Sequence, residues 1–299
     1  MSDSLPLLSR LGSGRPLLVS MDAEACMRAM GVSLHGPAAI GRLLREHPAV
    51  VAEHYHREIG CGVDVLAALT ADTIPRALAQ IGMTFRAAAL TGCAVDLALD
   101  AADAAPRPIL VAGVLGHPTV ASPPLARVAE ELAMHATRLA AAGCELILAR
   151  GFGPTAEPGL ARLARRASVI SAGTTELPTW AVLSVSDAGF TDDGESLEDA
   201  ARAAVDGGAQ LILLEIERAS AALPLLDRLR HAVPTVWLGA APAADAAQPV
   251  DTWVAEALVL LDAGIAVLGG GPGTTGRHLA ALARMIEPRH PPPQRPEAG

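Results

Sequence analysis

The chain has 299 residues, of which 51% are apolar and 18% are charged, and its formal net charge at pH 7 is -9. This length and apolar content allow one large buried core, so a single α/β barrel is sufficient and no second domain is needed. The negative charge opposes binding to phosphate backbones, so we expect no nucleic-acid partner.

The cysteine pattern and the chain ends indicate the compartment. No Cys-X-X-Cys pair and no disulfide spacing occurs among Cys26, Cys61, Cys93 and Cys144. The first residues lack an apolar export leader, and no apolar run reaches the roughly 18 residues that span a bilayer. We therefore expect a cytoplasmic protein with no membrane partner. The proline-rich segment 288–299 is predicted to be a disordered tail that follows a barrel domain over residues 1–287.

Short apolar runs recur along the whole chain. They occupy residues 16–21, 63–69, 108–116, 145–150, 179–186, 211–216, 235–240 and 265–270. Each run is apolar throughout rather than alternating, which is typical of parallel strands buried on both faces. Between and after these runs, apolar residues recur at the spacing of one face of a helix. These helical segments are 48–60, 85–104, 123–142, 157–166, 196–206, 219–231, 252–263 and 274–286. The pattern predicts a single (β/α)₈ TIM barrel, with a doubly wound open sheet as the alternative.

The carboxyl ends of barrel strands carry the catalytic groups of such folds. This rule selects four candidate catalytic residues, namely His117, Arg150, Asp187 and Glu215. We expect the substrate to be bound by further residues at the same end of the barrel, namely Asp22, Glu24, Thr70, Phe152, Ser184, Gly270, Gly271, Gly273 and Thr274.

Two of the candidate catalytic residues have alternative interpretations. In one interpretation, the planar guanidinium of Arg150 donates two hydrogen bonds to a carboxylate or phosphate of the ligand. In the other, it forms an ion pair with Glu215 or Asp187 across the barrel mouth. His117 is either a general base or an exposed residue at a helix entry. Together with Asp187 and Glu215 it has the residue types of a metal site, but the spacing is generic, so we predict no cofactor. The basic run 162–166 is interpreted as a solvated helix face.

The glycine-rich stretch GGGPGTTGRH, residues 269–278, follows the last apolar run and opens a helix. Glycine has no side chain, so a ligand can come close to its backbone, and the backbone N–H groups at the start of a helix can donate to an anion. One interpretation is therefore a loop that binds an anionic or phosphate substrate.

This stretch also resembles the homocysteine S-methyltransferase family, whose last barrel strand ends in two glycines, two zinc-binding cysteines, Gly-Thr-Thr and a histidine. The residues that match are Gly269, Gly270, Gly273, Thr274, Thr275 and His278. Residues 47–73 and 179–200 are similar to two earlier parts of the family pattern, in the correct order. The resemblance implies a TIM barrel that transfers a methyl group to a thiol.

The resemblance further implies a zinc ion held by three thiolates, one after the sixth strand and two after the eighth, which activates the acceptor sulfur. These three positions fall on Ile216, Gly271 and Pro272, so the zinc expected of the family has no ligands here. The acidic residue that the family places after the fourth strand is replaced by Arg150.

The sequence thus predicts methyl transfer to a thiol or related acceptor by a divergent site without zinc. One alternative is a non-catalytic small-molecule-binding or regulatory barrel derived from the family. Another is an enzyme that binds an anionic or phosphate substrate at the glycine-rich stretch. In each case the partner is a small molecule, and the sequence is compatible with a homo-oligomer.

Overall fold

The computed structural model describes residues 10–11, 15–20, 22–117, 125–152, 158–245 and 247–286, so the predicted tail 288–299 lies outside the described residues. Eight parallel strands close into one barrel, in which each strand pairs with the next and the last returns to the first. The strands are β1 (Leu17–Val19), β2 (Val65–Ala68), β3 (Leu110–His117), β4 (Leu146–Phe152), β5 (Thr179–Val185), β6 (Leu211–Ile216), β7 (Trp237–Pro242) and β8 (Val267–Gly269). The predicted TIM barrel is confirmed, and the open-sheet alternative is wrong.

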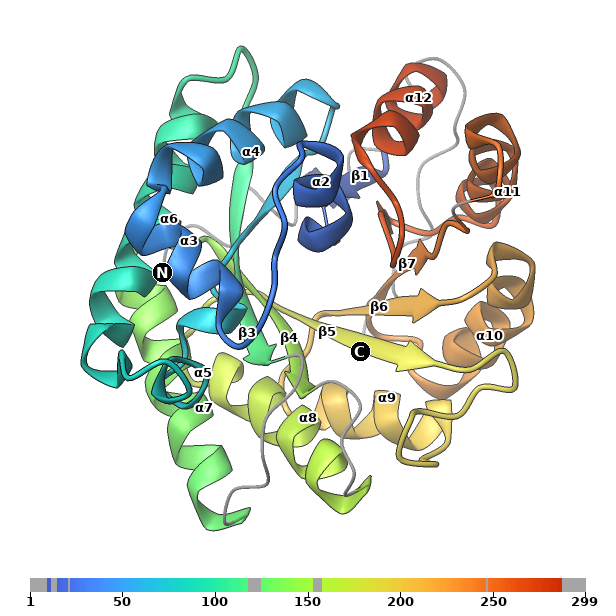
Figure 1. Ribbon diagram of the computed structural model, residues 1–299. Helices are drawn as coiled ribbons and strands as arrows, with labels where there is room; N and C mark the ends of the chain where they lie inside the picture. The colour runs from blue at the N-terminus through green and yellow to red at the C-terminus, as the bar shows by residue number, and fades with distance from the viewer. Residues whose placement is uncertain are drawn as a thin grey trace.

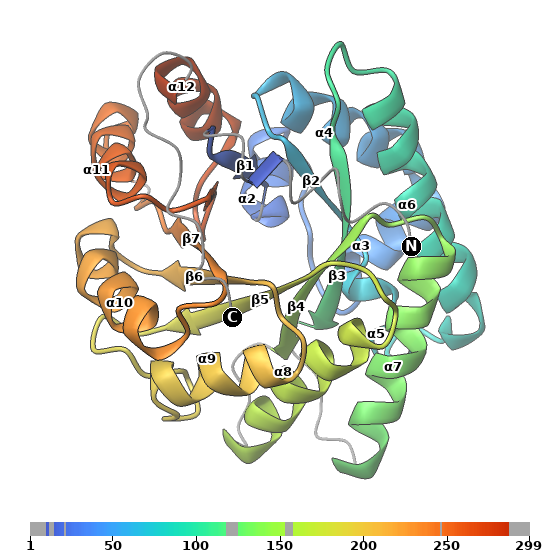
Figure 2. The ribbon, with the colours of Figure 1, turned by 180° about the vertical axis from the view of Figure 1, so that it is seen from behind.

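Helices surround the barrel, and the chain passes around it once, so that α12 returns close to β1 (Figures 1 and 2). They are α2 (Ala23–Ala29), α3 (Ala39–Glu46), α4 (Pro48–Gly60), α5 (Pro75–Ala79), α6 (Ala87–Asp103), α7 (Leu125–Ala141), α8 (Pro158–Gly173), α9 (Leu197–Asp206), α10 (Ala219–Ala232), α11 (Val250–Asp262) and α12 (Gly276–Ile286). Two short 3₁₀ helices, η1 (Ala71–Thr73) and η2 (Thr84–Arg86), lie between β2 and α6. In the described part of the chain, no helix combines the length and apolarity needed to cross a lipid bilayer.

The helices differ from the prediction in two respects. Helix α8 continues to Gly173, beyond the expected end at residue 166, because its buried face repeats every four residues through Ala164, Ser168 and Ala172. The short helices α2, α3 and α5 were not predicted. None exceeds eight residues, so their hydrophobic periodicity gives little signal.

The strands have apolar side chains on both faces because each face is buried. In β5, Trp180 and Val182 belong to the core inside the barrel, whereas Ala181 and Leu183 pack in the core beneath the helices. Strand side chains alternate in direction, so two buried faces require a continuous apolar run. The filled interior leaves the functional groups to the strand ends and the loops that follow them.

A bulge at the end of β4 positions Arg150. Leu115 of β3 is in register with Ala149, but the next residue, Gly116, is in register with Gly151, which leaves Arg150 as the extra residue. Gly151 has a φ of 73°, a conformation that favours glycine. A Cβ on Gly116 would lie 2.2 Å from the carbonyl oxygen of Gly151. The bulge therefore depends on both glycines, as bulges that redirect a side chain commonly do.

We predict that Gly116→Ala lowers the free energy of unfolding by about 1–3 kcal/mol, because the added methyl group overpacks against backbone that cannot move freely. Chemical denaturation followed by circular dichroism measures the change. Gly92→Ala is the control, because Gly92 lies inside α6 with no atom within 4 Å of the added Cβ. Alanine there should be neutral or stabilising. Equal stability of the two variants would contradict the role of Gly116.

Candidate functional site

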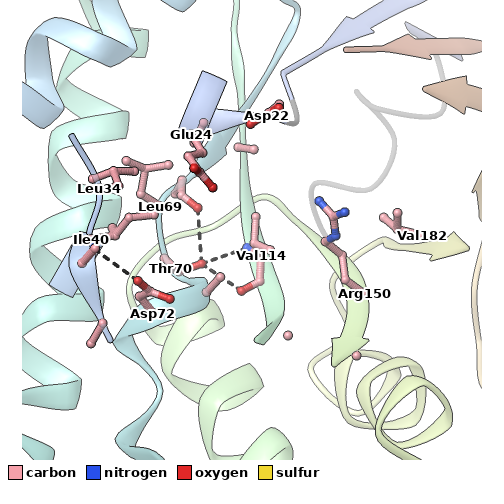
Figure 3. A pocket seen from close by; sticks show the side chains of 18 of the residues that line it. Asp22, Glu24, Leu34, Ile40, Leu69, Thr70, Asp72, Val114, Arg150 and Val182 are labelled. Atoms are coloured by element: carbon pink, nitrogen blue, oxygen red, sulfur yellow. Dashed lines mark hydrogen bonds between the residues drawn. The ribbon is translucent and has the colours of Figure 1, made fainter. Parts of the chain in front are cut away.

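A cavity of about 740 Å³ opens at the carboxyl ends of the strands. Residues at or near the ends of β1 to β6 line it, and the segment that leads into α3 forms part of its wall. Figure 3 shows Leu34, Ile40 and Leu69 on one side of the cavity and Arg150 and Val182 on the other. The volume is typical of a site for a small molecule.

Three strand ends are connected by hydrogen bonds in this cavity. Arg150 Nη2 donates to both carboxylate oxygens of Glu215 over 2.6 Å, and Ser184 Oγ donates to Glu215 Oε2 over 2.5 Å. The Glu215 side chain is only 10% exposed, so its charge requires these partners. Arg150 is 32% exposed, and its Nε and Nη1 donate to no described residue. The predicted ion pair is therefore made with Glu215.

Both acidic residues after β1 also line the cavity. Asp22 Oδ1 accepts from the backbone N–H of Ala25 over 2.9 Å and caps α2, while Oδ2 accepts from the backbone N–H of Gly273 over 2.7 Å. Glu24 is exposed and pairs with Arg28 of the same helix over 2.6 Å. Asp22 therefore joins the first and last loops of the barrel, and Glu24 contributes charge to the rim.

Thr70 borders the cavity but its hydroxyl holds two strands together. Its Oγ1 accepts from the backbone N–H of Val114 over 2.9 Å and donates to the Val114 carbonyl over 3.0 Å (Figure 3). The side chain is fully buried, and the Thr70 carbonyl lies 3.1 Å from His135 Nε2. Thr70 thus maintains the wall of the cavity.

The glycine-rich stretch does not line the cavity. The backbone N–H groups of Gly270, Gly271, Gly273 and Thr274 donate to Val19 O, Pro242 O, Asp22 Oδ2 and Gly271 O, respectively. Thr274 Oγ1 also donates to the Gly271 carbonyl over 2.6 Å. In the structure these four amides pack the last loop against its neighbours and do not face the cavity.

The other predicted residues lie as follows. Asp187 pairs with the exposed Arg218 over 2.6 Å and is not among the residues that line the cavity. His117 and Phe152 end β3 and β4, but their side chains lie outside the described part of the chain.

The residues at the expected thiolate positions do not fit a zinc ion. Ile216 is a buried aliphatic residue at the end of β6. Neither its side chain nor that of Pro272 has an atom that can bind a metal ion. A Cβ on Gly271 would lie 2.3 Å from the carbonyl oxygen of Ala241, so this backbone admits no side chain there. Among the described residues, no three His, Cys, Asp or Glu side chains are placed to hold a metal ion. The described donor set therefore does not support a zinc site built from three thiolates.

Sequence reasoning missed many residues of the cavity, and three of them are largely buried polar side chains on helices α4 and α8. Arg165, expected on a solvated face, is 12% exposed and pairs with Asp193 over 3.1 Å and Glu195 over 2.5 Å. His54 and Glu58 line the cavity from α4 and are 2% and 3% exposed. Their spacing of four residues on an otherwise apolar helix face is a signal that could have identified them.

The comparisons with known proteins agree with this fold. The sequence model described as homocysteine S-methyltransferase matches residues 24–286. The structure is similar to the metallated form of the homocysteine methyltransferase MmuM from Escherichia coli, with a TM-score of 0.77 and 19% identity over 94% of this chain and 99% of that chain. The oxidized form of the same protein has a TM-score of 0.76 and 18% identity, with the same coverage. A search of curated proteins found no match.

The family match runs from α2 to α12 and includes every strand except β1, and the structural similarity shows the same fold. The chain therefore belongs to the homocysteine S-methyltransferase family.

Proposed function

We propose that the protein transfers a methyl group to a thiol or a related small-molecule acceptor without a thiolate-bound zinc ion. Family membership supports methyl transfer, and the 740 Å³ cavity supports a small-molecule substrate. The observation that carries the zinc-free proposal is the hydrogen-bonded group of Arg150, Ser184 and Glu215, which supplies charge and basicity at the cavity.

Arg150 is suited to hold an acceptor that carries a carboxylate. The pairing with Glu215 fixes the guanidinium through Nη2 and leaves Nε and Nη1 without a described partner. These two nitrogens form a planar fork that matches the two oxygens of a carboxylate. The acceptor would then lie beside the side chain of Glu215.

Glu215 is suited to act as the general base. Its Oε1 accepts one hydrogen bond, from Arg150, and a carboxylate oxygen can accept a second. As the acceptor sulfur forms a bond to the methyl carbon, the bond between that carbon and the donor breaks, and its electron pair leaves with the donor. The thiol proton passes to Glu215. A neighbouring base thereby supplies the nucleophile that zinc would otherwise generate.

The proposal is tested by a direct assay of methyl transfer. The protein is incubated with homocysteine, or with related thiols and selenols, and with S-methylmethionine, S-adenosylmethionine, betaine or methyltetrahydrofolate as the donor. We expect mass spectrometry to find a methylated acceptor for at least one pair. If ligands raise the melting temperature but no pair gives product, the protein is a binding barrel and the proposal is wrong.

We predict that Arg150→Met raises KM for a carboxylate-bearing acceptor about tenfold to a hundredfold, because a hydrogen bond to a charged group is lost. The carboxamide analogue of the acceptor should lose much less. Steady-state kinetics on both acceptors measures the difference. Arg218→Met is the matched control, because Arg218 also pairs with a carboxylate but does not line the cavity. An equal loss with both acceptors would show that Arg150 does not bind the carboxylate.

We predict that Glu215→Gln lowers kcat about a hundredfold to ten-thousandfold, because the amide keeps the shape of the side chain but cannot accept the proton. KM should change little. Glu217→Gln is the control, since Glu217 is an exposed neighbour that does not line the cavity. An unchanged kcat in Glu215→Gln would exclude Glu215 as the base.

A further inference from the structure

Helix α4 contributes two buried polar side chains to the cavity. His54 and Glu58 are four residues apart, so they lie on the same face of the helix. Both line the cavity, together with apolar residues that include Leu34, Ile40 and Leu69. Figure 3 shows these three apolar side chains on the side opposite Arg150.

The hydrogen-bonding capacity of this pair is largely unused. Glu58 Oε1 accepts from Cys26 Sγ over 2.9 Å, but Glu58 Oε2 is buried and has no partner. Neither ring nitrogen of His54 has a hydrogen-bond partner among the described residues, although the ring packs at 5.6 Å from that of Tyr55. A buried polar group without a hydrogen-bond partner lowers the stability of the folded protein. A ligand that supplies the missing hydrogen bonds can offset this loss.

The environment favours the uncharged forms of both groups. Burial raises the pKa of the Glu58 carboxyl, and this effect outweighs the hydrogen bonds with Cys26 and Ser20, which lower it; the nearby Asp22 adds a smaller upward shift. Burial also lowers the pKa of His54 to about 4. At neutral pH the His54 imidazole is therefore uncharged and can donate at one nitrogen and accept at the other. The raised pKa of Glu58 favours its protonated form, which can donate a proton.

We propose that His54 and Glu58 form a second binding subsite of the cavity, which takes an uncharged hydrogen-bonding group of the ligand such as a carboxamide or hydroxyl. An anionic group is disfavoured here, because no described cation lies within hydrogen-bond distance of Glu58 or His54 and the charge of Asp22 acts on Glu58. A carboxamide can accept from the protonated Glu58 through its oxygen and donate to His54 through its N–H group. The inference rests on the proposed function only in that the cavity holds a small molecule.

The subsite is tested by nitrogen-15 NMR of the histidine rings in the full-length protein. Butyramide, butyrate and n-butylammonium are titrated separately as probes of equal chain length that differ in charge. The ring signals of His54 are assigned by their loss in His54→Gln. We expect saturable shifts with butyramide and weaker binding of both ions. Unmoved signals, or tighter binding of n-butylammonium, would overturn the proposal.

Variants of Glu58 separate a neutral subsite from a charged one. Glu58→Met should weaken butyramide binding about threefold to tenfold, as expected for one lost neutral hydrogen bond. Glu58→Gln should retain binding, because an amide donates and accepts like a protonated carboxyl group. Glu53→Met is the control on the exposed side of the same helix.

Loss of butyramide binding in Glu58→Gln, or undiminished binding in Glu58→Met, would contradict the proposal. If Glu58→Met does not fold, the ranking of the three probes and the Glu58→Gln variant still decide the outcome. The NMR measurement needs no turnover, so a failed methyl-transfer assay leaves its result intact.

Discussion

The ion pair between Arg150 and Glu215 organises the open end of the barrel. It crosses β5, whose Ser184 donates to the same carboxylate, and so connects three consecutive strands. A carboxylate as buried as that of Glu215 is stable only with such partners. The pair in turn depends on the bulge of β4, since Gly116 and Gly151 allow the backbone to approach closely where Arg150 leaves the regular strand.

The glycine-rich last loop serves the closure of the barrel. Its glycines and threonine close the barrel by bonding to β1, β7 and Asp22. Close contact with the Ala241 carbonyl leaves no space for a side chain at Gly271. The described contacts of this loop are thus packing contacts, and the polar side chains that line the cavity include those from the ends of β1, β2, β4, β5 and β6 and from α4.

Features that follow from a continuous apolar pattern could be predicted from the sequence. Features that depend on how helices, strands and loops pack against one another could not. The eight strands were predictable because burial on both faces leaves no polar positions. The partner of Arg150 was predictable as one of two carboxylates, since strand ends converge at one rim. In contrast, the burial of Arg165 depends on where α8 meets the loop after β5, and the position of Glu58 depends on how α4 packs. The partners of the loop amides likewise depend on contacts across the barrel closure.

Zinc-free methyl transfer at Arg150 and Glu215 is tested most directly by anomalous X-ray diffraction at the zinc absorption edge. Crystals of the active protein would be grown with zinc in the medium and soaked with the acceptor. We expect no anomalous peak near Ile216, Gly271 or Pro272, and acceptor density beside the Arg150 guanidinium and the Glu215 carboxylate. A zinc peak in contact with the acceptor sulfur would contradict this mechanism.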